Sequence, residues 1–515
     1  MARSVSLTGS ALMHRMMGLA LAAAGCGASA LAGAAATEDT TITIYSSATP
    51  GAISADLYRP VPGRGVVNAG SVPGYALVKQ ERNIHVEAGR SQLRFTDVAA
   101  YIDPTTVTFT SLSDPGTRVL EQNFQFDLVS TDKLLQKYVD RPVTIERNGG
   151  GTLDGTLLAS QDGLVVRTAD GSITAIRNYG ALKFPDLPGG LITRPTLLWD
   201  LSVGKAGDQR VRVTYQTTGI TWWADYNLIF SAGASANTGF VDLAAWVSII
   251  NQSGATYNDA KLKLVAGDVH RAPAAPSPLV MSRLAESAVA TRDAGFAERA
   301  FDEFHLYTLG RTTTLPNNSA KQLELFDQAR RLPAQRLFVF AGGPAPYASD
   351  TPLTDRNFGG RSQAKVDSYL SFRNDKASGL GVPLPAGRIR VSRLDATDGS
   401  LEFIGEDVID HTPRDETVRV KLGSAFDVVG ERHQLSFNID TKARWMEEEI
   451  EVKLRNHKAE AIEVQVQESL FRGVNWTIVT SSQPFQKLDS RSVQFPVKLV
   501  ADGQAAVRYR VRYSW

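Results

Sequence analysis

The chain is dominated by short runs of alternating apolar and polar residues separated by turn residues. Because successive side chains of a β-strand point to opposite faces of a sheet, such runs predict half-buried strands. The clearest runs are 41–45, 91–95, 106–109, 210–215, 223–230, 244–250, 303–307, 388–391, 449–454 and 461–470. With 43 Gly and 23 Pro to make the turns, this spacing predicts an all-β protein built mainly from antiparallel β-sandwich domains.

The first 36 residues differ from the rest of the chain. Their only charged side chains are arginines, and their apolar stretch, 16–24, is too short for the ~20 apolar residues of a membrane span. This pattern predicts a signal peptide at 1–36, cleaved after Ala36, and a periplasmic or secreted mature protein. The alternative is a lipoprotein, in which Cys26 of a lipobox-like segment is lipidated and tethers the protein to a membrane. No later segment is apolar for long enough to predict a transmembrane helix.

Charge and cysteine content narrow the possible functions. Among 515 residues, 55 Lys and Arg balance 54 Asp and Glu, and removing the two leader arginines leaves 53 against 54. This balance does not favour a nucleic-acid partner, because a protein that neutralises phosphates needs a basic excess. The one cysteine is Cys26, so a mature chain that starts after Ala36 has neither a disulfide nor a thiol nucleophile.

Three segments follow the leader. Residues 37–130 predict an N-terminal β domain. Residues 131–188 begin with helical spacing and continue with about five hairpin-linked strands, which is typical of a small SH3-like or Sm-like barrel. We interpret this barrel as a spacer or partner-docking module, since it lacks a basic stripe with stacking aromatic residues. Residues 189–515 predict one large β-sandwich with a mobile insertion at 271–298, where the prolines of 273–278 disfavour both helix and central strand.

The last strand alternates clearly. From Val507 to Trp515, aliphatic and aromatic residues share one face and three arginines share the other. A terminal aromatic residue on such a strand is also typical of the closing strand of an outer-membrane barrel. Many other strands are short and carry charges on both faces, so we interpret this one as a sandwich strand that buries its aromatic residues.

Several segments of the second half resemble one bacterial family. They are Gly219–Tyr226, Asn258–Val269, Glu303–Tyr307, Pro383–Gly387, Ile404–Asp407, Ile409–Pro413, Gly423–Asp427 and Leu454–Lys458. In this order they are similar to the domain-of-unknown-function family that includes the mucoidy-inhibitor-A-like proteins, over about 195–515. The resemblance implies a β-sandwich core in an exported or envelope-associated protein with no established biochemical activity. Unlike the mucoidy-inhibitor relatives, this chain has no coiled-coil heptad run, so a function carried by a helical stalk is not implied.

Candidate chemistry rests on acids placed beside histidines. The candidates are three pairs: Asp268 with His270, Glu303 with His305, and Asp410 with His411. Residues two apart in a strand share a face, so each of the first two pairs would present a carboxylate beside an imidazole. If the three pairs converged, they would suffice for a metal site or a general acid–base pair. The alternative is that the first two are surface pairs and that Asp410 caps a turn fixed by Pro413.

Trp222 and Trp223 are neighbours in a predicted strand, so one must face the core while the other is free to stack on a sugar. The chain contains no nucleophile elbow, zinc-protease motif, phosphate-binding loop or Cys-x-x-Cys pair, and we expect no cofactor. The sequence therefore predicts a non-catalytic binding or scaffold protein of the cell envelope, with an envelope protein or a glycan as partner. The alternatives are a metal-dependent hydrolase acting on envelope polymer through the three pairs, and a glycan-binding protein that uses Trp222 or Trp223.

Overall fold

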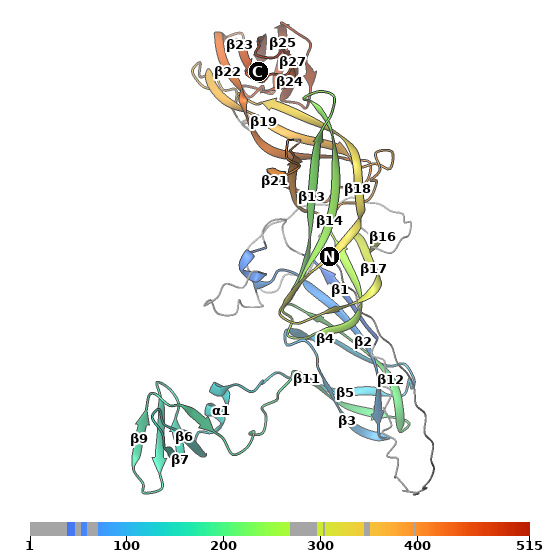
Figure 1. Cartoon of the computed structure of the whole chain (residues 1–515), viewed down its shortest axis with the longest axis vertical. Coiled ribbons are helices and arrows are strands. Elements are labelled where there is room, and N and C mark those ends of the chain that lie inside the picture. Colours follow the sequence, from blue (N-terminus) through green and yellow to red (C-terminus); the bar gives the residue numbers. More distant parts are fainter. Residues whose placement is uncertain are drawn as a thin grey trace, which may run out of the picture. The chain divides into compact units, whose positions relative to one another are not determined.

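The computed structural model describes residues 39–46, 53–58, 71–267, 296–301, 304–344, 351–395 and 397–515. Within these ranges the chain is mainly β, with one α-helix, α1 (Thr131–Lys137), and one short 3-10 helix, η1 (Ala55–Leu57) (Figure 1). The predicted signal peptide, Cys26 and residues 271–295 of the predicted insertion lie outside the described residues, while residues 296–298 begin a strand. No helix in the described part of the chain is long and apolar enough to cross a membrane.

A seven-stranded mixed sheet combines strands from both halves of the chain (Figure 1). In order across the sheet, its strands are β16 (Phe296–Phe301), β17 (Phe304–Leu315), β15 (Tyr257–Ala266), β1 (Asp39–Tyr45), β2 (Tyr75–Val86), β12 (Gly207–Thr217) and β4 (Ile102–Ser111). β1 runs parallel to β15, and the other pairs of this sheet are antiparallel. β1 illustrates the predicted alternation, since Ile42 and Ile44 are fully buried while Thr41 and Thr43 lie on the other face.

A three-stranded antiparallel sheet packs against the first one. Its strands, in order, are β3 (Gly89–Thr96), β11 (Thr196–Val203) and β5 (Arg118–Gln125). Trp199 of β11 is fully buried, and its ring lies 5.1 Å from that of Phe109 on β4 and 5.5 Å from that of Phe95 on β3. Both sheets therefore contain strands that precede residue 130 and strands that follow residue 189 in the sequence.

Residues 131–188 contain α1 and a five-stranded antiparallel sheet. Across this sheet the strands are β10 (Ala181–Lys183), β6 (Pro142–Glu146), β7 (Thr152–Ala159), β8 (Leu164–Thr168) and β9 (Ile173–Ile176). The Ser130 hydroxyl caps α1 by accepting a hydrogen bond from the Lys133 amide, and Leu135 and Tyr138 are buried as the helical spacing predicts. The expected closed barrel is wrong, because β9 and β10 pair only with β8 and β6 in this fully described segment.

The largest sheet has thirteen strands (Figure 1). Ten of them follow one another in the order β21 (Leu401–Ile409), β20 (Gly387–Leu394), β13 (Ile220–Ala232), β14 (Thr238–Asn251), β18 (Ser319–Phe340), β19 (Arg361–Arg373), β22 (Thr417–Asp440), β23 (Trp445–Asn456), β28 (Gln504–Ser514) and β25 (Asn475–Ser481). The other three are β24 (Ile462–Ser469), which pairs with β18, β27 (Ser492–Leu499), which pairs with β24, and β26 (Gln486–Lys487), which pairs with β27. The β13–β20 and β18–β24 pairs are parallel, so the expected antiparallel pairing holds for most but not all strands.

The thirteen-stranded sheet takes part in two separate hydrophobic cores. The first core joins β13, β14 and part of β18 to the seven- and three-stranded sheets. The second core, which we call the C-terminal core, lies among β22, β23, β24, β27 and β28. β18 contributes to both, with Leu323 and Leu332 in the first and Phe338 and Phe340 in the second. The last strand buries its aliphatic and aromatic face in the C-terminal core, which confirms the alternation predicted for it.

Candidate functional site

The two neighbouring tryptophans of β13 point to opposite faces of the sheet, as alternation requires. Trp222 is 2% exposed and belongs to the first core. Its indole N–H donates to the Val265 carbonyl over 3.2 Å, and its ring makes an edge contact with Tyr307. Because both the ring and its polar atom are used inside the core, Trp222 has no surface left for a ligand.

Trp223 lies on the outer face and is half-buried. Its indole N–H donates to Asp225 Oδ2 over 2.7 Å, and its ring packs against Tyr58, with 5.6 Å between the ring centroids. Ile53, Leu57 and Tyr58, at and beside η1, form a small apolar cluster with Trp223. The ring and the N–H of Trp223 therefore already have partners on the outer face, so this indole is not a free surface on which a sugar could stack.

Asp225 is the centre of a polar network on this face. Its carboxylate accepts hydrogen bonds from Trp223, from the Ser248 hydroxyl (2.9 Å) and from Arg390 Nη1 (3.5 Å). Ser248 in turn accepts a hydrogen bond from Gln322 Nε2 over 3.0 Å. Asp225 is only 8% exposed, so three donors compensate most of the cost of burying its charge. Such a network holds its members in one arrangement without a ligand.

Trp246 lies beside Asp225, directly opposite it in the β13–β14 ladder. It is 37% exposed, and on its other side it pairs with Glu324 of β18, which is also exposed. One strand beyond Asp225, Arg390 is held by Glu406 over 2.9 Å. We call this surface the Asp225 face; its members are Trp223, Asp225, Trp246, Ser248, Gln322, Glu324, Arg390 and Glu406.

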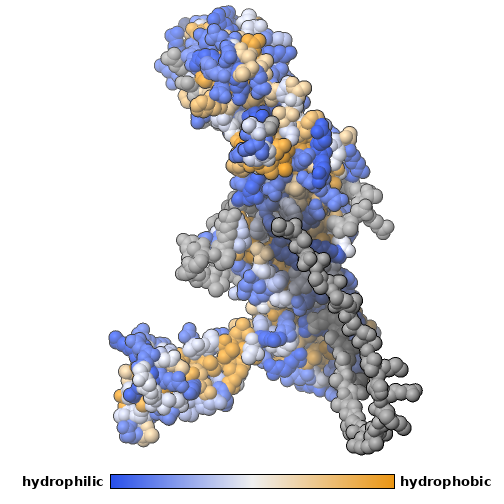
Figure 2. All heavy atoms as spheres, viewed as in Figure 1, coloured by the Kyte–Doolittle hydropathy of each residue, from blue (hydrophilic) through white to orange (hydrophobic). Residues whose placement is uncertain are grey.

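Sequence reasoning found Trp223 but missed Trp246. The signal was present, because Trp246 occupies an outward position of the run 244–250 that also predicted β14. Its neighbours Asp225, Glu324 and Arg390 come from three other strands, and only the strand order brings them together. Figure 2 shows that hydrophilic residues cover most of the visible surface, with smaller hydrophobic patches between them.

The predicted acid–histidine pairs are only partly described. Asp268, His270 and Glu303 lie outside the described residues. His305 is described, and its Nδ1 lies 2.7 Å from Oε1 of Glu298 on β16. The acid that contacts His305 is therefore on the neighbouring strand, a partner that residue spacing along one strand cannot reveal.

Asp410 and His411 follow β21 in a loop that contacts a second loop, 383–386. His411 Nδ1 accepts a hydrogen bond from the Ala386 amide over 3.1 Å, and Thr412 forms an isolated bridge with Leu384. Tyr307, two residues after His305, donates to the Pro383 carbonyl over 3.1 Å. This contact links β17 to the loop that touches His411, but among the described residues no three Asp, Glu, His or Cys side chains form a metal-binding group.

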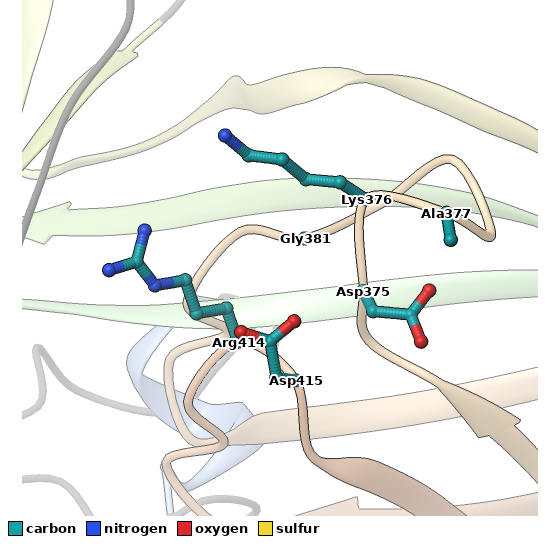
Figure 3. Close-up of a pocket in the computed structure, with 6 residues that line it drawn as sticks. All are labelled: Asp375, Lys376, Ala377, Gly381, Arg414 and Asp415. Carbon is teal, nitrogen blue, oxygen red and sulfur yellow. The ribbon is translucent and has the colours of Figure 1, made fainter.

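A pocket of about 470 Å³ opens between the β19–β20 connection and the segment that leads into β22 (Figure 3). It is lined by Asp375, Lys376, Ala377, Gly381, Arg414 and Asp415. In Figure 3 the side chains of Lys376 and Arg414 extend toward the same side, whereas the Asp375 carboxylate points away from them. Ser378 occupies that carboxylate by donating its amide and its hydroxyl, and these hydrogen bonds lower the pKa of Asp375. The pocket is a polar loop junction with balanced charge.

No family model matches the sequence, and no curated protein matches it. The resemblance to the family of the mucoidy-inhibitor-A-like proteins therefore stays a prediction from the segments named above.

Proposed function

We propose that this chain is a non-catalytic binding protein of the cell envelope and that the Asp225 face of its β-sandwich binds an envelope glycan. The observation that supports the proposal is an exposed indole, Trp246, set beside a carboxylate network that is already ordered. The leader supports export, and the segment 131–188, whose helix and strand order resemble an SH3-like or Sm-like module, is proposed as a spacer or docking unit.

The chemistry of the face fits a sugar. The C–H groups of a sugar ring pack on an indole, while its hydroxyls both donate and accept hydrogen bonds. Glu324 offers an acceptor and Gln322 a donor on the strand next to Trp246, while Arg390 and Glu406 extend the polar surface on the far side of Asp225. Because Asp225 fixes Trp223, Ser248 and Arg390 beforehand, little conformational entropy is lost when a ligand binds.

Replacing Trp246 with alanine is expected to weaken binding of soluble glycan fragments released from cell-wall peptidoglycan about tenfold, which corresponds to about 1.4 kcal/mol of lost stacking. Isothermal titration calorimetry measures the affinity. The melting temperature should stay unchanged, because Trp246 is 37% exposed.

The matched control is Phe426→Ala, which removes an aromatic ring that is 96% exposed on β22 of the same sheet. It should leave glycan binding intact. Equal affinities of wild-type protein and the Trp246→Ala variant, or no binding by the wild-type protein, would contradict the proposal.

A metal-dependent hydrolase is the second candidate, and the His305–Glu298 contact favours it. Glu298 holds Nδ1 of the imidazole, which leaves Nε2 as the atom that would bind a metal. Elemental analysis of the purified protein tests this candidate: about one equivalent of zinc, lost in the His305→Ala variant, supports it. If the purified protein contains no bound metal, the hydrolase candidate is excluded and the binding function remains.

A further inference from the structure

The outer face of the seven-stranded sheet carries an unbalanced charge cluster around Glu81. This carboxylate, 11% exposed, accepts from Arg212 Nη2 (2.8 Å) and Arg210 Nη2 (3.2 Å), and Lys79 Nζ lies 3.6 Å away. The hydrogen bond from Arg212, reinforced by that from Arg210, lowers the pKa of Glu81. One carboxylate therefore orders three cations and neutralises only one of them.

The strand register extends this cluster into a row across six strands. The row consists of Thr312, Lys261, Thr41, Lys79, Thr214 and Thr108, each the direct partner of the next. Lysines thus alternate with threonines from β17 to β12. Since neighbouring strands are about 4.8 Å apart, Lys261 and Lys79 lie roughly 10 Å from each other along the row.

The face around this row is basic although the chain as a whole is nearly neutral. Its five cations are Lys79, Arg210, Arg212, Lys261 and Lys263, and its three anions are Asp39, Glu81 and Asp103, so the local net charge is +2 (5 minus 3). We call this surface the Lys79 face. The side chains of Lys79, Arg212 and Lys261 are 38%, 42% and 58% exposed. At one end of the face, outside these rows, His85 pairs with Asp208 over 2.8 Å.

We propose that the Lys79 face binds an extended acidic polysaccharide laid across the strands. The cations recur along a flat row, which fits a polymer whose carboxylates or other anionic groups recur along its length. Threonine hydroxyls between them offer donors and acceptors to sugar hydroxyls. At one end, Tyr45 and Tyr75 stack on each other at 4.8 Å and add an aromatic surface.

The same face is a poor match for a membrane. Peripheral membrane sites combine basic residues with exposed large apolar side chains that enter the lipid. Here the residues between the cations are mainly threonines, and Leu77 is half-buried. The Lys79 face is also separate from the Asp225 face, so each proposal can fail without the other.

The test uses the full-length protein and polygalacturonate, an acidic polysaccharide, with neutral dextran as the comparison polymer. At an ionic strength of about 0.05 M the wild-type protein should bind polygalacturonate and not dextran, and about 0.5 M salt should abolish binding. The double variant Lys79→Gln, Lys263→Gln should bind about tenfold more weakly. Both arginines are retained in this variant, so Glu81 keeps its strongest partners and the fold is preserved.

The matched control is Lys442→Gln, Lys498→Gln, which removes one exposed lysine of the β22–β23 turn, one exposed lysine of β27 and the same net charge. It should bind polygalacturonate like the wild-type protein, and so should the Trp246→Ala variant. Equal weakening in both double variants would show a net-charge effect and overturn the proposal. Loss of binding in Trp246→Ala, or stronger binding to phosphatidylglycerol vesicles than to polygalacturonate, would overturn it as well.

Discussion

Replacing Glu468 with leucine is expected to lower the free energy of unfolding by about 3–5 kcal/mol. Glu468 and Arg432 form a fully buried ion pair in the C-terminal core, with side chains 0% and 1% exposed and 2.8 Å between Oε2 and Nε. Without the carboxylate, the Arg432 guanidinium would stay buried with only the Gly359 carbonyl as an acceptor among the described residues. An uncompensated buried charge is one of the most costly single defects that a core can contain.

The contacts around this pair explain why the loss should be large. Tyr509 donates to the same Glu468 oxygen over 2.5 Å, and burial raises the pKa of Tyr509, so its hydroxyl remains a proton donor. Arg432 Nη2 and Glu468 Oε1 already have no hydrogen-bond partner among the described residues, so no neighbouring group is placed to take over a lost bond.

Chemical denaturation followed by circular dichroism measures the effect. The double variant Arg432→Met, Glu468→Leu should recover most of the stability, because it buries apolar groups where the single variant buries a lone charge. A pair on neighbouring strands with an exposed cation is the matched control: Arg512, 52% exposed, lies 2.9 Å from Glu447, and Arg512→Met should cost at most about 1 kcal/mol. A similar cost for Glu468→Leu and Arg512→Met would contradict the prediction.

Replacing Trp222 with alanine is expected to cost about 3–5 kcal/mol of unfolding free energy. The indole is 2% exposed in the first core, so alanine would leave a cavity where the ring packs beside Tyr307. The Val265 carbonyl would also lose the indole donor. The two losses act together, and thermal and urea denaturation should both show them.

Trp246→Ala provides the matched comparison, because it makes the same substitution on the neighbouring strand β14 but removes an exposed ring. It should change stability by less than about 1 kcal/mol while it lowers glycan affinity. If Trp222→Ala were as stable as Trp246→Ala, the assignment of Trp222 to the core would be contradicted.

Alternation along the chain predicted individual strands well. Ile42 and Ile44, the 223–230 run and the last strand are buried on one face as period two requires, because a strand's own residues decide which of its faces is apolar. The helix at 131–137 and the hairpins that follow it could be predicted from the sequence equally well, since both depend on contacts close in sequence.

The pairing of strands that are far apart in the chain could not be predicted from the sequence. The parallel β1–β15 pair joins residues more than two hundred positions apart, and no local residue pattern specifies that partner. The contact of Glu298 with His305 across neighbouring strands was missed for the same reason, as were the arginines that surround Glu81. The helix and strands expected at 131–188 are present, but β9 and β10 each pair with one neighbour only, so the expected barrel is not closed.

The sequence by itself determined that the protein is mainly β, which residues of each strand face inward, and where the local hairpins and the helix lie. Only the tertiary structure decided the two surfaces on which function is proposed. Trp246 lies beside Asp225, and Lys79 beside Thr41 and Thr214, because hydrogen-bonded ladders bring strands from distant parts of the chain into register. A strand's own pattern sets which side chains point outward, whereas the order of its neighbours sets what those side chains form together.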